Sequence, residues 1–258
     1  NKVVDYQDTS YGAAWLENLE KLVSLDQRYG GLVQDFAFST QAAKYLANAW
    51  CYDDIIRVAD LKTRATRTKR INKEVGADDS HVVKVTEYVH PGAAEFISMM
   101  PKRLGHFVAG RPSLIKRIDR WVNRGRRIRS DSLSGFLIFY LLAGMQRWRL
   151  SLYRHSTEMA HIEGWLGAAT ERLPYDYAHA VSILRVRRLI KGYSDTHARG
   201  LGKFDRVMMG AALLAGHPDA SEWTERLIET ALRDVEGVAL DGALKTVESF
   251  VNPEIPVS

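Results

Sequence analysis

Cysteine is nearly absent from this sequence, because Cys51 is the only one among 258 residues. A single thiol excludes an internal disulfide. It also excludes an iron–sulfur cluster or a zinc finger ligated by the cysteines of this chain alone. Cys51 stands between Trp50 and Tyr52 in a stretch with helical spacing, which predicts a buried, unreactive thiol. Together with the absence of a leader sequence, the low cysteine content favours a cytoplasmic protein.

Long apolar runs are also missing. The mostly apolar run over residues 133–145 is shorter than the roughly 20 residues that span a bilayer, and Ser134, Gly135 and Gly144 interrupt it. We therefore expect no membrane association, and a helix at the centre of the domain in this place. The sequence starts at Asn1 rather than at a methionine, and we expect it to be a piece of a longer protein.

The sequence lacks the common nucleotide motifs. Gly200-Leu-Gly202 is followed by Asp205 where a dinucleotide-binding fingerprint has its third glycine, and Lys203 is followed by Phe204 rather than the Ser or Thr of a P-loop. The backbone amides of residues 200–203 remain a candidate anion site at a helix start.

Metal-binding patterns are incomplete. Glu158-x-x-His161 matches half of a di-iron motif, and Glu87-x-x-His90 repeats its spacing in a stretch that reads as a strand. A di-iron site needs two such pairs on helices and two further carboxylates, so we expect no metal in this chain.

Helical apolar spacing covers most of the chain. It predicts helices over residues 11–28, 40–74, 93–100, 102–109, 112–122, 133–172, 177–190, 203–215, 221–235 and 239–250. Residues 81–89 are rich in valine and form the one strand-like stretch. With no internal repeat or low-complexity linker, the sequence predicts a mainly α protein. We expect one helical domain over residues 1–258, with about eight to ten helices and at most a minor β element.

Positive charge is concentrated in two stretches, although the net charge is only +5. Residues 57–73 hold seven Lys or Arg and one Asp, and residues 111–129 hold eight and one. Such stretches attract nucleic acid, acidic proteins or anionic ligands, or form solvated helix faces. We expect an acidic partner to bind a basic patch of Arg124, Arg126, Arg127 and Arg129. Nucleic acid is the alternative, because Trp121 lies among the arginines and aromatic rings stack on bases.

Two short charged motifs, residues 57–64 and 191–199, are the candidate polar or anion-binding cluster. Asp60 and Arg64 share a helix face, while Gly192 is placed to end a helix and start a polar corner. We predict that the motifs meet in one ion-paired cluster, with unrelated surface faces as the alternative. The residues of this candidate cluster are Arg57, Asp60, Lys62, Arg64, Lys191, Tyr193, Asp195, Thr196, His197 and Arg199.

Four stretches of the sequence are distinctive. They are Tyr52-Asp-Asp-Ile-Ile-Arg-Val-Ala-Asp-Leu-Lys-Thr-Arg64, Val89-His-Pro-Gly92, Arg129-Ser-Asp-Ser-Leu-Ser-Gly-Phe136 and Arg188-Leu-Ile-Lys-Gly-Tyr-Ser-Asp-Thr-His-Ala-Arg-Gly200. Together they resemble the C-terminal helical region of the larger, bacterial form of the indolepyruvate ferredoxin oxidoreductase β-subunit family. The resemblance covers residues 11–250. Ser194 stands where the family usually has Gly, which affects only the expected turn geometry.

The resemblance implies an accessory or assembly domain that also handles substrate, CoA or electron acceptor, without the γ-type domain that precedes it in the family. The whole complex would decarboxylate 2-oxoacids such as arylpyruvates oxidatively. Thiamine diphosphate and iron–sulfur clusters would lie in the partner subunit, so we expect no cofactor and no catalytic activity in this chain alone. The alternative is a helical module that binds nucleic acid or another anion through its two basic stretches.

Overall fold

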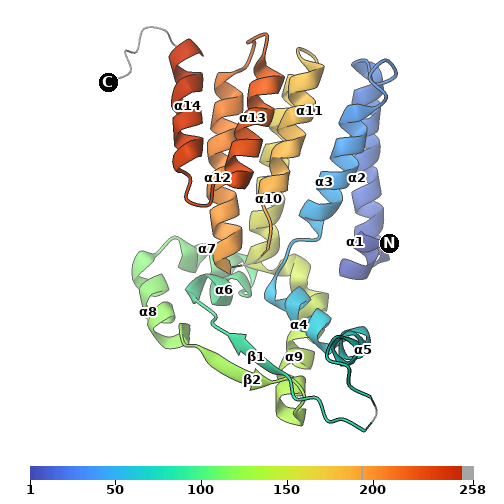
Figure 1. The fold of residues 1–258 in the computed structure, drawn as a ribbon, viewed down its shortest axis with the longest axis vertical. Coiled ribbons are helices and arrows are strands. Elements are labelled where there is room, and N and C mark those ends of the chain that lie inside the picture. Colours follow the sequence, from blue (N-terminus) through green and yellow to red (C-terminus); the bar gives the residue numbers. More distant parts are fainter. Residues whose placement is uncertain (79, 193, 252–258) are drawn as a thin grey trace. The chain divides into compact units, whose positions relative to one another are not determined.

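The protein is mainly α-helical in the computed structural model (Figure 1), which describes residues 1–78, 80–192 and 194–251, without the side chains of residues 194, 195 and 250. These residues form 14 α-helices, 12 of them with at least 7 residues, two 3-10 helices and one two-stranded antiparallel sheet. The mainly α class and the minor β element are confirmed, but the helix count exceeds the predicted eight to ten. Across the described residues, no helix combines the length and apolar character needed to cross a membrane.

The chain forms two compact units. Unit 1 consists of Asn1–Tyr52 and Ala160–Ser258, and unit 2 consists of Asp53–Met159. Whether the two units together make up the single domain expected from the sequence depends on how they are joined. The single domain therefore stays a prediction.

Unit 1 is a set of helices packed around apolar side chains. Its elements are α1 (Lys2–Tyr6), α2 (Thr9–Arg28), α3 (Ala37–Trp50), the second part of α10 (Tyr153–Arg172), α11 (Tyr177–Arg185), the 3-10 helix η2 (Val186–Leu189), α12 (Ser194–Leu213), α13 (Ala220–Arg233) and α14 (Val238–Val251). Helix α3 contacts α2 and α11, and α13 contacts α11, α12 and α14. Figure 1 shows α11 to α14 running with roughly parallel axes. Phe38, Leu46, Trp165, Leu184 and Leu227 are fully buried, which places the core among these helices.

A buried carboxylate ties three helices of unit 1 together. Asp26 on α2 is fully buried and accepts hydrogen bonds from the backbone and hydroxyl of Ser39 on α3, at 2.8 and 2.6 Å. The Tyr177 hydroxyl on α11 also donates to Asp26, at 2.8 Å. Burial, with the neighbouring Asp26 charge, raises the pKa of Tyr177 to about 12. The phenol therefore keeps its proton and remains a donor at neutral pH.

Unit 2 is smaller and combines short helices with the sheet. Its elements are α4 (Ile55–Thr63), α5 (Ala65–Glu74), β1 (Thr86–Val89), α6 (Ala93–Ser98), α7 (Lys102–Ala109), α8 (Pro112–Val122), β2 (Arg126–Arg129), α9 (Leu133–Gly144), the 3-10 helix η1 (Met145–Ser151) and the start of α10. Helix α4 packs along α9, and α6, α7 and α8 pack together. Ala93 and Ile97 of α6 and Val108 of α7 form a small buried cluster, against which partly buried residues of α8 pack.

The two longest predicted helices are broken, which, together with the unpredicted α1, accounts for the larger helix count. The expected helix over residues 40–74 divides into α3, α4 and α5, because Asp54 starts a new helix and Arg64 is extended (φ −69°, ψ 134°). The expected helix over residues 133–172 divides into α9, η1 and α10, with Leu152 extended between the last two. A cap that binds the next turn competes with helix continuation, and the apolar period alone does not show this competition.

The predicted strand is shorter than expected and has a partner that the sequence did not indicate. Strand β1 pairs with β2 in an antiparallel register that sets Glu87 opposite Ile128 and Tyr88 opposite Arg127. Alternation then places Thr86, Tyr88, Arg127 and Arg129 on one face, and all four are exposed. Glu87 lies on the other face and is buried. The arginines of β2 hid its strand character, because they do not alternate with apolar residues.

Helix α9 corrects the expectation that this apolar segment lies at the centre of the domain. Only Gly135 and Phe139 of α9 are buried, while Leu133 and Leu141 are 77% and 69% exposed. Helix α4 is the main element that packs on α9 and covers one side of it. Because α9 is apolar all round, the sequence predicted that every side of it is buried. The helices and strands that pack on α9 in unit 2 are too few and too small to cover all of its sides.

Candidate functional site

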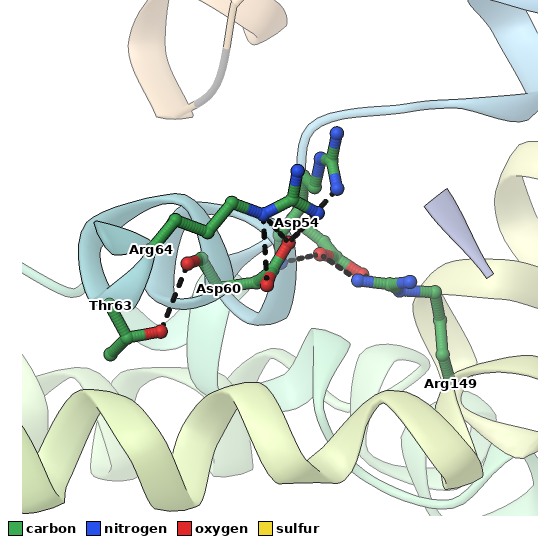
Figure 2. A network of polar contacts seen from close by, with 6 residues as sticks. Asp54, Asp60, Thr63, Arg64 and Arg149 are labelled. Carbon is green, nitrogen blue, oxygen red and sulfur yellow. Dashed lines mark hydrogen bonds and ion pairs between the residues drawn. The ribbon is translucent and has the colours of Figure 1, made fainter. Parts of the chain in front are cut away.

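Asp54 and Arg149 form a buried ion pair that joins the start of α4 to η1 (Figure 2). The Arg149 Nε donates to the Asp54 Oδ2 at 2.9 Å, and the exposed fractions of the two side chains are 2% and 6%. Asp54 also caps α4, because its Oδ1 accepts from the Arg57 backbone N–H at 2.6 Å. One carboxylate therefore both starts the helix and neutralises a buried guanidinium.

Asp60 lies between two arginines, Arg57 in the same helix and Arg64 directly after its end. Its Oδ2 is 2.9 Å from an Arg57 nitrogen and 2.7 Å from an Arg64 nitrogen, at the i−3 and i+4 positions. The Thr63 hydroxyl donates to the Asp60 carbonyl oxygen at 3.0 Å, near the end of α4 (Figure 2). The helix face expected to be shared by Asp60 and Arg64 is corrected, because α4 ends at Thr63 and Arg64 is extended, although both arginines pair with Asp60.

Glu87 on β1 binds two further basic residues of the same stretch. The Lys62 ammonium and the Arg67 guanidinium both form ion pairs with its carboxylate. Burial alone would raise the pKa of Glu87. The hydrogen bond and charge of Lys62 and the charge of Arg67 outweigh burial and hold the pKa below its usual 4.5. Four of the seven basic residues in 57–73 are thus paired with Asp60 or Glu87, so much of this positive charge is used inside unit 2.

The second basic stretch is displayed to solvent. Arg124, Arg126, Arg127 and Arg129, the predicted basic patch, are all exposed in β2 and the turn before it. The Arg127 guanidinium lies 5.4 Å from the centre of the Tyr88 ring. Arg129 pairs with Asp131, whose hydrogen bond raises the pKa of the arginine. Arg127 and Arg129 share one face of the ribbon, whereas Arg126 lies on the other face by alternation. The binding of these arginines to a partner stays a prediction.

The corner at residues 191–199 belongs to unit 1, whereas the motif at residues 57–64 belongs to unit 2. The contact predicted between the two motifs therefore stays a prediction. Lys191, Thr196 and Arg199 are exposed and His197 is buried, while Tyr193 and the side chain of Asp195 lie outside the described residues.

A close approach of α12 to the preceding segment shapes this corner. Gly192 has a φ of +71°, the left-handed conformation expected at a helix end. A Cβ on Gly200 would lie 2.8 Å from the Leu189 carbonyl oxygen. Gly200 therefore allows α12 to cross close to η2, which is a packing role. The anion site expected at the amides of residues 200–203 assumed a helix start there, and this is wrong: these residues lie inside α12, where backbone N–H groups bond to carbonyls of the helix itself.

Further titratable residues take structural places. Glu158 pairs with Arg154 at 2.8 Å, and His161 hydrogen-bonds the buried Arg187 at 2.8 Å. In residues 1–78, 80–192 and 194–251, no group of three His, Cys, Asp or Glu side chains could hold a metal ion. Cys51 caps the end of α3 and is half-buried, rather than buried inside a long helix as expected.

Sequence reasoning missed the most buried charges. Asp54 had a readable signal, because an Asp directly before Ile55-Ile56 is a good cap. Arg149 and Arg187 had none, since each stands in a mixed apolar and basic segment that reads as helix surface. In the sequence Glu87 stands out only as half of a metal pattern, because its cation partners lie 20 and 25 residues earlier in the chain.

Comparisons with known proteins give one result. No curated protein and no solved structure matches this chain. A family model described as a family of unknown function, DUF6537, matches residues 1–210. This match includes all of unit 2 and the corner at residues 191–199, and the chain belongs to this family.

Proposed function

We propose that this chain is an accessory and assembly domain, C-terminal in an indolepyruvate ferredoxin oxidoreductase-like subunit, that supports oxidative decarboxylation of 2-oxoacids by the whole complex. One structural observation carries the proposal beyond the resemblance of the four stretches. Their polar residues in unit 2 build a scaffold: Asp54 and Asp60 hold ion pairs, and Ser132 caps α9 through the Gly135 N–H at 3.2 Å. That scaffold displays the basic patch on β2.

In this proposal the chemistry belongs to the partner, which holds thiamine diphosphate and iron–sulfur clusters. The chain contributes a rigid, positively charged docking surface. Exposed arginines raise the rate of association with an acidic surface, and salt screens that effect. The carboxylates of α4 and β1 are already bound by arginine and lysine, so they are poorly placed to act as bases toward a substrate.

The test uses the complete subunit that contains this chain, tagged and purified from cells that express its partner. We expect co-purification of a polypeptide that contains thiamine diphosphate and iron–sulfur clusters, and indolepyruvate-dependent reduction of an artificial acceptor. The chain alone should show no turnover. Turnover by the isolated chain, or a partner without 2-oxoacid activity, would contradict the proposal.

Charge reversal tests the docking role directly. The triple variant Arg126→Glu, Arg127→Glu and Arg129→Glu should slow complex formation about tenfold or more at low ionic strength. The matched control reverses three exposed basic residues of unit 1, Lys21, Arg28 and Lys245. It makes the same change in net charge and should associate at nearly the wild-type rate. Equal association rates for both triple variants at low salt would count against the patch.

Nucleic acid binding is a second candidate, favoured by one observation. The outward face of the ribbon sets Tyr88 beside Arg127, and Trp121 on the preceding α8 is 72% exposed. An exposed aromatic ring among arginines suits base stacking and phosphate contact. If the protein contacts four phosphates, raising the salt concentration from 50 to 200 mM would weaken its binding to duplex DNA roughly a hundredfold. Submicromolar affinity that persists at the higher salt, and that Tyr88→Ala reduces, would favour this alternative.

A further inference from the structure

Helix α9 carries a continuous stripe of exposed apolar side chains. The stripe follows the i, i+3, i+4, i+7, i+8 spacing of one helix face, and its members are 40% to 77% exposed. The residues of this α9 stripe are Leu133, Phe136, Leu137, Tyr140 and Leu141. Scattered apolar residues are normal on a protein surface, but a contiguous stripe marks an interaction site.

Contacts with β2 and α4 fix the position of the helix that carries the stripe. The Ser132 side chain accepts from the Gly135 N–H and donates to the Arg129 carbonyl oxygen at 2.7 Å, which fixes the start of α9 to the end of β2. Phe139 is buried, and α9 packs along α4, whose ion pairs hold that helix in turn. The stripe is therefore a preformed helix surface, and a partner need not order it on binding.

Positive charge lies at both ends of the stripe. Residues 120–157 contain eight arginines, of which Arg129, Arg149 and Arg154 form ion pairs with Asp131, Asp54 and Glu158. The exposed arginines of this segment include Arg126 and Arg127 before α9 and Arg147 after it. Strand β2 contacts α9 at the start of the stripe. At the other end, the exposed Arg147 guanidinium stacks on the half-exposed Trp148 ring, 3.9 Å from its centre. A partner that covers the stripe thus meets apolar side chains in the middle and arginine at each end.

Three kinds of occupant suit an apolar surface, and charge separates them. A second copy of this chain would bring the same arginines against each other, and like charges across an interface are unfavourable. A helix that binds an anionic bilayer carries Lys or Arg along its own polar face, whereas α9 contains no charged residue and the arginines lie beyond its two ends. A protein helix with acidic residues beside its apolar face suits this surface, because its carboxylates can reach the arginines and accept a hydrogen bond from the Tyr140 hydroxyl.

We propose that the α9 stripe docks an amphipathic helix of a partner protein whose apolar face is edged by Asp or Glu. The rows Leu133–Leu137–Leu141 and Phe136–Tyr140 form the ridges between which the side chains of a second helix pack. This inference deepens the proposed function by placing the partner on the chain. It rests on that function only for the identity of the partner.

The experiment measures peptide binding by fluorescence anisotropy on the full chain. Two labelled helical peptides share the same leucine face, and one has glutamate margins while the other has lysine margins. We expect the glutamate peptide to bind and the lysine peptide to bind at least tenfold more weakly. The double variant Leu137→Glu with Leu141→Glu should weaken binding of the glutamate peptide about tenfold or more. The control Leu32→Glu with Val33→Glu, at residues 76% and 86% exposed in unit 1, should leave binding unchanged.

Further measurements separate the other occupants. Far-ultraviolet circular dichroism checks that each variant folds, and Tyr140→Ser replaces the double variant if that one does not. Preferential binding of phosphatidylserine vesicles over the glutamate peptide would overturn the proposal in favour of a membrane. Self-association that the α9 variant abolishes would overturn it in favour of a second copy. If the peptide binds at α9 but no oxidoreductase subunit co-purifies, the surface stands and the proposed function fails. If that subunit co-purifies equally with the α9 variant, the proposed function stands and the docking site is elsewhere.

Discussion

Replacing Arg149 by Met should destabilise the protein more than most single substitutions on its surface. The Arg149 and Asp54 side chains are 2% and 6% exposed, so the substitution leaves the Asp54 carboxylate buried without its guanidinium. Removing one member of a buried pair costs about 3–5 kcal/mol of unfolding free energy. For a chain of this size, that corresponds to a fall in Tm of roughly 10 °C.

The double variant Asp54→Ser with Arg149→Met isolates the ion pair from the helix cap. Serine retains a capping oxygen for the Arg57 backbone N–H, whereas methionine fills much of the arginine's volume without a charge. With both charges gone, the loss should be about 0–2 kcal/mol, well below the sum of the two single variants. Urea denaturation followed by circular dichroism gives the four free energies of this cycle.

An exposed pair provides the control. Arg226 and Glu222 are bonded on α13 with side chains 57% and 62% exposed, and Arg226→Met should change the unfolding free energy by no more than about 0.5 kcal/mol. The reasoning fails if Arg149→Met costs less than about 1 kcal/mol, or if the double variant is as unstable as the sum of its parts.

Three further substitutions test other parts of the structure. Because the folded pKa of Glu87 lies below 4.5, its stabilisation is present above that pH and is lost on acidification. Glu87→Gln should therefore cost about 3 kcal/mol at pH 7 and flatten stability between about pH 5 and 3. Burial lowers the pKa of His179, whose ring nitrogens both lack a hydrogen-bond partner among the described residues. On acidification His179 gains a proton in the unfolded chain before it does so in the folded protein, so the free energy of unfolding should fall as pH drops below about 6.5. This fall should be smaller in His179→Leu. Gly200→Ala brings a Cβ against the Leu189 carbonyl and should lower Tm, while Gly202→Ala, with open space around it, should not; equal Tm values would contradict the close helix approach.

Local sequence patterns predicted a helix well where residues that favour a helix start or end lie directly at its two ends. The expected helices over residues 102–109 and 112–122 match α7 and α8 residue for residue, because Pro101 and Gly110 bound the first and Pro112 starts the second. The helix ending at Arg28 was similarly marked by Gly30-Gly31. In these cases the signals lie within a few residues of the helix, so the sequence alone carries them.

The candidate site depended on partners that are distant in sequence. The closeness of Asp60 to Arg57 and Arg64 could be predicted, because they are only three and four residues apart, although Arg64 lies just beyond the end of α4. The pairs of Asp54 with Arg149 and of Glu87 with Lys62 span 95 and 25 residues, and no local pattern links such residues.

Composition and periodicity by themselves determined that this protein is mainly helical, that its one cysteine forms no disulfide within the chain, and that its positive charge gathers in two stretches. These properties depend on residue type and on neighbours within a turn or two. Tertiary structure decided how each stretch is used: Asp60 and Glu87 pair with four basic residues of the first, while the arginines of the second in and before β2 are exposed. It also decided that the most apolar helix lies at the surface, because burial depends on how much neighbouring structure reaches a side chain and not on that side chain's own hydrophobicity.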